Sequence, residues 1–165
     1  MSSTTDRIEK TVLLRAPVER VWRAITDPVE FGDWFGLELD GAFLPGATVL
    51  GRIKPTRVDP AVAEMQQKHA GLELSLFVER VEPMSLLSYR WHPFAVDPGV
   101  DYSNEPMTVV TFTLEPDGGA TRLRVVESGF DSIPVERRRA AFEANGQGWA
   151  IQMQLVEKYL LLPQA

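Results

Sequence analysis

The sequence predicts a single α+β domain, residues 1–165, in which an antiparallel sheet of about seven strands is covered by a long C-terminal helix. Three observations lead to this prediction. Segments with the alternating pattern of half-buried strands follow one another with short connections, which favours antiparallel pairing. Apolar residues recur at helical spacing over residues 134–162. The length of 165 residues and the hydrophobic content of 44% are those of one ordinary domain.

The chain opens with a strand and two short helices. Residues 7–15 are rich in β-forming side chains and predict the first strand. Pro17 follows, and proline is tolerated in the first turn of a helix because its missing N–H is not needed there. This helix ends near Asp27, since a residue that precedes proline avoids the α region. A second short helix is predicted over residues 29–35.

Glycines and prolines divide the middle of the chain. Two strands, residues 37–43 and 47–53, are expected on either side of a turn at Pro45. Residues 54–71 break the strand pattern, and we expect an insertion here that carries a short helix and acts as a lid. Four more strands are predicted, over residues 72–81, 86–92, 107–115 and 121–128.

The predicted C-terminal helix carries an unusual pair of glycines, Gly146 and Gly148. Each costs about 1 kcal/mol relative to alanine in a helix interior. The pair therefore predicts either a kink or a place where close packing needs the missing side chains. The apolar stripe on either side consists of Phe142, Trp149, Met153, Val156 and Leu160.

Composition argues against several classes of function. There is no cysteine, so disulfides and thiol catalysis are excluded, and with only His69 and His92 no metal site is expected. No nucleotide-binding motif is present and no cofactor is expected. The net charge of −6 does not favour nucleic acid. We expect a cytoplasmic protein, because neither a secretory signal nor an apolar run long enough for a membrane span is visible.

Several local strings resemble a known superfamily. The most specific covers residues 11–28, where a strand, Ala-Pro, a helix with Val-Trp at its centre and Thr-Asp-Pro follow one another. On this basis the chain is similar to the START-like (SRPBCC) superfamily, and within it to the family related to the C-terminal domain of the activator of heat-shock-protein-90 ATPase. Later strings that fit are Phe31–Phe35, Pro45-Gly46, Glu82-Pro83, Leu86–Trp91, Thr121–Phe130 and Gly148-Trp149.

The resemblance implies a helix-grip fold, in which a curved seven-stranded sheet surrounds the long helix and leaves a cavity between them. Members of the superfamily bind lipids, sterols, polyketides and other hydrophobic molecules, a minority are cyclases, dehydratases or hydrolases, and the co-chaperone relatives act by protein contact. This chain departs from the family at residues 54–71 and 94–106, which look longer than usual. It also has Glu127 where the family more often has histidine.

The candidate site is the expected cavity under the last helix. Glu127 shares a strand face with Leu123 and Val125, so an inward carboxylate would be a candidate acid, base or polar anchor. The alternative is that the strand ends there and Glu127 meets solvent. For the aromatic candidates the alternative is ordinary core packing. The expected cavity residues are Trp34, Phe35, Phe77, Tyr89, Trp91, Phe112, Glu127, Trp149 and Met153.

Three functions remain open from the sequence. The first is binding of a small hydrophobic or aromatic molecule, gated by the insertion at residues 54–71. The second is a protein-interaction module with a chaperone partner, although the relatives that activate the chaperone carry an additional N-terminal domain. The third is an enzyme of the cyclase or hydrolase kind that uses Glu127 or His92 as acid–base. No membrane partner is expected, and a homodimer is left open because no residue argues for one.

Overall fold

The predicted α+β class is confirmed by the computed structural model, which describes residues 6–97 and 99–162. The strands are β1 (Arg7–Leu14), β2 (Leu37–Leu39), β3 (Thr48–Ile53), β4 (Glu73–Glu82), β5 (Leu86–Trp91), β6 (Thr108–Asp117) and β7 (Ala120–Ser128). The helices are α1 (Val18–Thr26), α2 (Pro28–Phe35), α3 (Pro60–Gln67) and α4 (Val135–Leu161), with a 3-10 turn over Phe130–Ser132.

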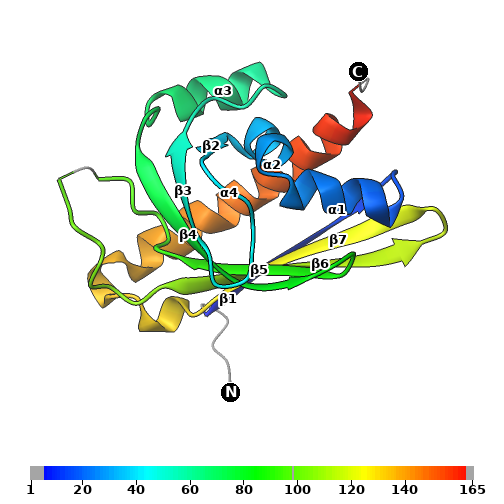
Figure 1. Ribbon diagram of the computed structural model, residues 1–165. Coiled ribbons are helices and arrows are strands. Elements are labelled where there is room, and N and C mark those ends of the chain that lie inside the picture. The colour runs from blue at the N-terminus through cyan, green and yellow to red at the C-terminus, as the bar shows by residue number, and fades with distance from the viewer. Residues whose placement is uncertain (1–5, 98, 163–165) are drawn as a thin grey trace.

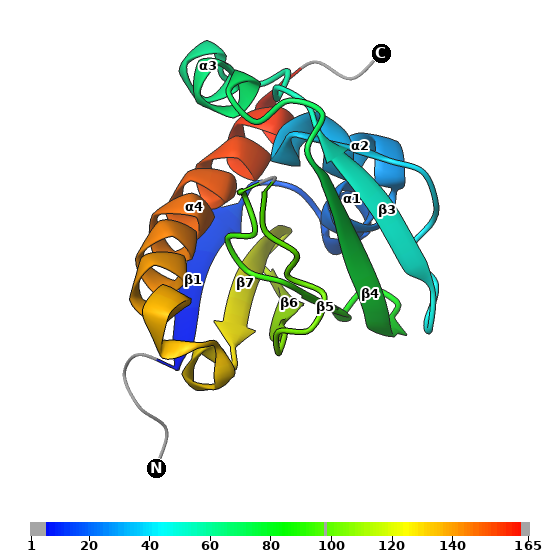
Figure 2. The same cartoon turned by 90° about the vertical axis from the view of Figure 1, so that its left-hand side faces the viewer.

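The seven strands form one antiparallel sheet in the order β1-β7-β6-β5-β4-β3-β2. The sheet curves beneath α4, which crosses it diagonally, while α1 and α2 lie over the same side (Figure 1). Turned by 90°, the molecule shows α4 running beside β1, with α3 near the end of α4 (Figure 2). This is the helix-grip arrangement that the resemblance implied, and it places the face of α4 opposite the inner face of the sheet.

Helix α2 begins and ends at residues whose chemistry sets its bounds. The Asp27 carboxylate accepts hydrogen bonds from the backbone N–H groups of Val29 (2.9 Å) and Glu30 (3.1 Å), which caps the first turn. The helix ends at Gly36, whose φ of 99° lies in the left-handed region. A side chain there would also meet the amide of Gln66 at 2.3 Å. The backbone therefore turns sharply at this glycine and delivers Phe35 to the centre of the molecule.

Strand β2 is shorter than predicted, because it ends at Leu39 rather than at residue 43. The reason is the next side chain, since the Asp40 carboxylate accepts a hydrogen bond from the backbone N–H of Leu50 at 3.1 Å. Short polar side chains of this kind compete with the ladder for backbone groups. The other strands lie within two residues of their predicted ends.

The inner face of the sheet forms the core. Along β7 the residues Leu123, Val125 and Glu127 are buried and their neighbours point outward, and β6 shows the same alternation. The two strands are in register, with Val110 opposite Glu127. An ionisable side chain therefore lies among apolar residues on the inner face of the sheet.

Helix α4 runs without interruption through both glycines. Close packing does not explain either of them, since a Cβ at Gly146 would meet only Ile8 Cδ1 at 4.0 Å, and one at Gly148 would meet nothing within 4 Å. Gly148 therefore faces open space. Across residues 6–97 and 99–162, α4 included, no helix is both long enough and apolar enough to cross a bilayer.

Candidate functional site

A cavity of about 360 Å³ lies between α4, the β3–β5 part of the sheet and the two segments at its mouth. These segments are α3 and the loop between β5 and β6. The end of α2 closes the cavity with Phe35, and β5 contributes Trp91. None of the described residues that line it is an aspartate, glutamate, lysine or arginine. The cavity is therefore an uncharged, mostly apolar space.

Helix α4 lines the cavity with a single stripe. Its lining residues share one side of the helix and are Asn145, Gly148, Trp149, Ile151 and Gln152. Gly148 is in the middle of this stripe, where a Cβ would meet nothing within 4 Å. The missing side chain at this position leaves room inside the cavity.

The Glu127 carboxylate lies behind the cavity wall and is fully buried. Oε1 accepts hydrogen bonds from Trp149 Nε1 (2.8 Å) and Asn145 Nδ2 (2.9 Å). Oε2 accepts from Trp91 Nε1 (2.8 Å) and Thr108 Oγ1 (2.5 Å). All four donors are neutral, and hydrogen bonds to a buried carboxylate are the strong kind. Glu127 thus holds two indole rings in fixed positions.

Those two indoles form part of the cavity wall. The ring centroids of Trp91 and Trp149 are 5.9 Å apart, and Phe35 is 5.8 Å from Trp149 and 6.3 Å from Trp91. These separations are typical of packed aromatic pairs. Because Glu127 fixes both indole nitrogens, the rings present carbon edges and faces to the space in front of them.

Tyr89 lies deeper, in contact with Trp91 and Phe112. Its hydroxyl is buried and has no hydrogen-bond partner among the described residues. Burial raises the pKa of Tyr89 well above its usual value, and the nearby charge of Glu127 raises it further. Tyr89 is therefore a neutral phenol in the core rather than a residue of the cavity wall.

The loop between β5 and β6 is held over the cavity by Arg137 of α4. Its guanidinium donates to both carboxylate oxygens of Glu105 (2.8 Å at the shortest) and to the backbone carbonyls of Pro93 and Phe94 (both 3.1 Å). It also lies over the ring of Tyr102, with its central carbon 4.6 Å from the centroid. One side chain thus ties both ends of the loop to α4.

His92 lies where this loop leaves β5, and it lines the cavity. Its Nδ1 atom is buried without a hydrogen-bond partner among the described residues. Burial lowers the pKa of His92 and Arg137 lowers it further, and these effects outweigh the opposing charges of Glu105 and Asp101. The neutral imidazole is therefore favoured at the edge of the cavity.

Helix α3 is fixed at the other side of the mouth by two contacts. Gln66 donates from Nε2 to the carbonyl oxygen of Phe35 (3.0 Å) and accepts from the backbone N–H of Thr56 (2.8 Å). At the start of α3, Lys158 forms an ion pair with Asp59, which lowers the pKa of that carboxyl. The insertion is thereby attached to both α2 and α4.

The sequence-predicted residues fall into three groups. Phe35, Trp91 and Trp149 line the cavity, and Glu127 lies directly behind the two indoles. Phe77 lines instead a neighbouring depression, which shares His92, Ala95 and Val96 with the cavity. The remaining candidates are buried in the core and do not line the cavity: Trp34, Tyr89, Phe112 and Met153.

Sequence reasoning missed the polar half of the site. Asn145 and Gln152 line the cavity, and Asn145 also completes the set of donors around Glu127. Both residues lie at helical spacing from Trp149, at i−4 and i+3, so the periodicity that pointed to Trp149 carried the signal. His92 lines the cavity, and His69 does so from just beyond α3.

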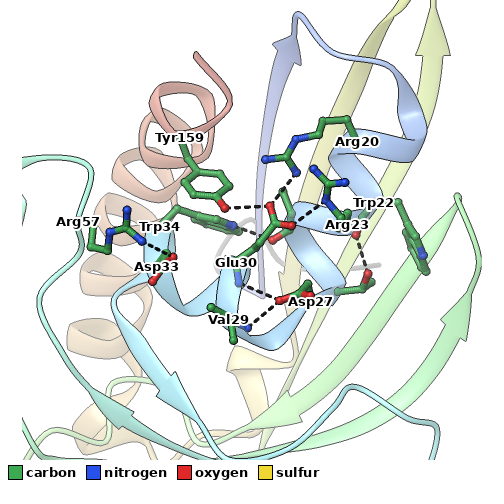
Figure 3. Close-up of polar contacts among 12 residues, drawn as sticks. Arg20, Trp22, Arg23, Asp27, Val29, Glu30, Asp33, Trp34, Arg57 and Tyr159 are labelled. Atoms are coloured by element: carbon green, nitrogen blue, oxygen red, sulfur yellow. Dashed lines mark hydrogen bonds and ion pairs between the residues drawn. The ribbon is translucent and has the colours of Figure 1, made fainter. Parts of the chain in front are cut away.

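A second polar centre lies away from the cavity, where α1, α2 and the end of α4 meet (Figure 3). The Glu30 carboxylate accepts from Arg20 (2.7 Å), Arg23 (2.8 Å) and the hydroxyl of Tyr159 (2.8 Å). The Arg20 guanidinium also lies near the Tyr159 ring, 5.6 Å from its centroid. This cluster joins three helices and takes no part in the cavity wall.

Comparisons with known proteins agree with the geometry. The family described as "Activator of Hsp90 ATPase homolog 1-like protein" matches residues 15–160. Protein MLL2253 from Mesorhizobium loti is 28% identical, with a TM-score of 0.67, and the match covers 93% of this chain and 96% of that one. No curated protein matches this chain.

Two further solved structures share the fold. DynU16, encoded in the dynemicin biosynthetic locus, is 26% identical with a TM-score of 0.66; the match covers 94% of this chain, which spans 47% of that one. The Aha1 dimer from Colwellia psychrerythraea has a TM-score of 0.68 at 16% identity, over 96% of this chain and 98% of that one, and shows the fold alone. The family match takes in nearly every helix and strand described above. The chain therefore belongs to the Activator of Hsp90 ATPase homolog 1-like family, within the START-like superfamily that its opening strings resemble.

Proposed function

We propose that this protein binds a small hydrophobic or aromatic molecule in the cavity between the sheet and α4. The observation that carries the proposal is an uncharged cavity of about 360 Å³ whose wall includes Phe35, Trp91 and Trp149. Small-molecule sites are typically apolar spaces of about 300–1,000 Å³ with a few polar groups. Membership of the family supports the same function, because the family's fold surrounds a helix with a curved sheet.

Two features support an open cavity rather than an accidental gap. Gly148 occupies the centre of the α4 stripe at a cost of about 1 kcal/mol relative to alanine. Glu127 is buried at the expense of its hydration and holds Trp91 and Trp149 by their indole nitrogens. Both features lower stability locally, and both shape the same space.

The mouth supports a gated site. Helix α3 and the β5–β6 loop both line the cavity, and each is attached to α4 through one side chain of that helix. Lys158 pairs with Asp59 at the start of α3, whereas Arg137 contacts Glu105, the carbonyls of Pro93 and Phe94 and the ring of Tyr102. The Lys158 side chain is half-exposed in its pair with Asp59, and exposed ion pairs contribute little net stability, so α3 is the more weakly attached of the two segments. The insertion would then admit the molecule that the cavity holds.

Glu127 serves this function as a positioning residue. Both of its oxygens accept hydrogen bonds from neutral donors, and its carboxylate is not part of the cavity wall. A general acid or base must come within hydrogen-bond reach of the proton that it transfers. A catalytic version of the site would therefore depend on His92, which does line the cavity.

Native mass spectrometry of the purified protein, followed by solvent extraction, tests the proposal directly. A co-purifying apolar molecule would support it and would name the ligand class. A clean apo mass would favour the interaction-module function instead, which the family name and the dimeric Colwellia relative support. A pull-down for a chaperone partner, together with the oligomeric state in solution, would then decide.

A pair of variants at one position makes the test independent of the natural ligand. Gly148→Phe places a ring in the cavity, whereas Gly148→Ala adds one methyl group to open space. Titration with the neutral dye N-phenyl-1-naphthylamine should give enhanced fluorescence with the wild type and with Gly148→Ala. It should give none with Gly148→Phe. Equal dye binding by all three proteins would place the dye elsewhere and would count against the cavity.

A further inference from the structure

The side-chain amide of Gln152 has a defined orientation in the cavity wall. Its Nε2 donates to the backbone carbonyl of Phe35 at 3.0 Å. Only the NH₂ end of an amide can face a carbonyl oxygen at this distance, because two oxygens would leave no proton between them. The oxygen Oε1 must therefore occupy the other side of the amide.

That oxygen is buried and has no hydrogen-bond partner among the described residues. Buried polar atoms in folded proteins almost always have one, so an unpaired acceptor calls for an explanation. Gln66 offers the contrast, since it donates to the same Phe35 carbonyl while its Oε1 accepts from Thr56. Of the two glutamines that donate to the Phe35 carbonyl, Gln152 is the one whose side-chain oxygen has no partner among the described residues.

The remaining polar atoms of the wall define what this oxygen can meet. The indole N–H groups of Trp91 and Trp149 are engaged by Glu127, and so is the NH₂ group of Asn145. No aspartate, glutamate, lysine or arginine among the described residues lines the space. The Nδ1 atom of His92 is the other unpaired atom there, and as a neutral imidazole it can accept or donate. No donor among the described residues of the wall is paired with the Gln152 oxygen.

From this arrangement we infer that the cavity selects an uncharged aromatic molecule carrying an O–H or N–H group, which donates to Gln152 Oε1. The inference rests on the proposed function and adds its chemical class. The aromatic part would pack against Phe35, Trp91 and Trp149, and the donor would satisfy the Gln152 oxygen, which has no partner among the described residues. A charged ligand is disfavoured, because nothing in the wall compensates a buried charge.

Two probes of nearly the same shape test the inference. 2-Naphthol carries a neutral O–H at pH 7, and 2-methoxynaphthalene has the same ring and oxygen without the donor. Equilibrium dialysis would measure both dissociation constants for the wild type, for Gln152→Met and for Gln154→Met. Gln154 is the matched control, because it is exposed on the same helix and does not line the cavity.

The wild type should bind 2-naphthol about tenfold more tightly than the ether, the ratio expected for one buried hydrogen bond. Gln152→Met should bring the ratio close to one, and Gln154→Met should leave it unchanged. Equal affinities of the wild type for both probes would overturn the inference while leaving the proposed function in place. Failure of the wild type to bind either probe would overturn both.

A measurement on the wild type alone covers the case in which Gln152→Met does not fold. The side-chain amide resonances of Gln152, assigned in a ¹⁵N-labelled sample, should move when 2-naphthol is added. The ether should produce a clearly smaller change. If both probes moved the Gln152 resonances equally, the amide would respond to the ring and not to the donor, and the inference would be overturned.

Discussion

Glu127 and Glu30 are both carboxylates that join α4 to the rest of the molecule, yet their surroundings are opposite. Glu30 accepts from two arginines and a tyrosine hydroxyl, and its side chain is 17% exposed. Glu127 is 0% exposed and accepts only from neutral donors. The first charge is balanced by cations beside solvent, whereas the second is held inside the sheet by hydrogen bonds alone.

The difference separates a structural contact from a candidate functional one. An ion cluster at the edge of the solvent can be assembled wherever helices meet, and its removal costs less because water can replace part of the lost contacts. A buried carboxylate without a cation is expensive, so its four donors must be placed accurately. Two of those donors are the indoles of the cavity wall. Stability and the shape of the cavity are therefore coupled at Glu127 and independent at Glu30.

Glu127→Ala should have the largest effect, a loss of at least about 3 kcal/mol of unfolding free energy, because four buried donors lose their acceptor. Urea unfolding monitored by circular dichroism would measure it. Glu127→Gln is the control: it keeps the shape and one acceptor oxygen and should lose less. A loss of unfolding free energy below about 1 kcal/mol in Glu127→Ala would mean that these hydrogen bonds contribute little to stability.

Glu30→Ala should cost about 1–2 kcal/mol, since Arg20, Arg23 and Tyr159 can turn partly to water. Salt sharpens the contrast. In about 1 M sodium chloride the loss at Glu30 should shrink, because the Debye length falls to about 3 Å. The loss at Glu127 should stay the same, because its donors are neutral. Equal salt dependence at the two sites would contradict the distinction.

Gly148→Ala should raise the unfolding free energy by about 1 kcal/mol, the helix propensity gained where no neighbour is disturbed. Thermal unfolding would measure the gain. Gly32→Ala provides the opposite case in α2, near Glu30, because a Cβ there would meet the Leu37 carbonyl oxygen at 2.2 Å. If Gly148→Ala lowered the unfolding free energy, as Gly32→Ala is expected to do, the space in front of Gly148 would have to be filled.

The smallest effects should appear at opposite ends of the pH scale. Burial lowers the pKa of His92 in the folded protein. Its contribution to the unfolding free energy is therefore complete above about pH 6.5 and is lost as pH falls through the folded pKa. The folded pKa of Tyr159 is raised by burial and by its bond to Glu30. Its contribution is therefore complete below about pH 10 and is lost as pH rises further.

Melting temperature against pH tests both windows. His92→Gln should flatten the acid side, and Tyr159→Phe should reduce the fall on the alkaline side. Tyr89, whose pKa burial also raises, contributes to the same alkaline window, so some fall should remain in Tyr159→Phe. If the fall in melting temperature at acid pH were the same in His92→Gln as in the wild type, His92 would not be its source.

Much of the fold could be predicted from local patterns. Pro17, Asp27 and Gly36 mark the bounds of the first two helices, because each acts on the backbone directly beside it. The premature end of β2 was missed, since it depends on a side-chain bond from Asp40 to a residue ten positions away. The glycines of α4 were read as a kink or a close contact, and only packing shows that Gly148 faces open space.

The sequence by itself determined the kind and order of the elements and the face on which each residue lies. Alternation along β7 puts Glu127 on the same side as Leu123 and Val125, and helical spacing puts Gly148 and Gln152 on the side of Trp149. These are consequences of backbone geometry, which acts over a few residues.

Only the tertiary structure decided which side chains meet. Glu127 receives its donors from Trp91, 36 positions earlier, and from Trp149, 22 positions later. Gln152 finds its partner at Phe35, 117 positions away, while its own side-chain oxygen is buried without a partner among the described residues. Periodicity specifies a direction for each side chain, but partners are set by how the curved sheet closes on α4, and that depends on the packing of the whole core.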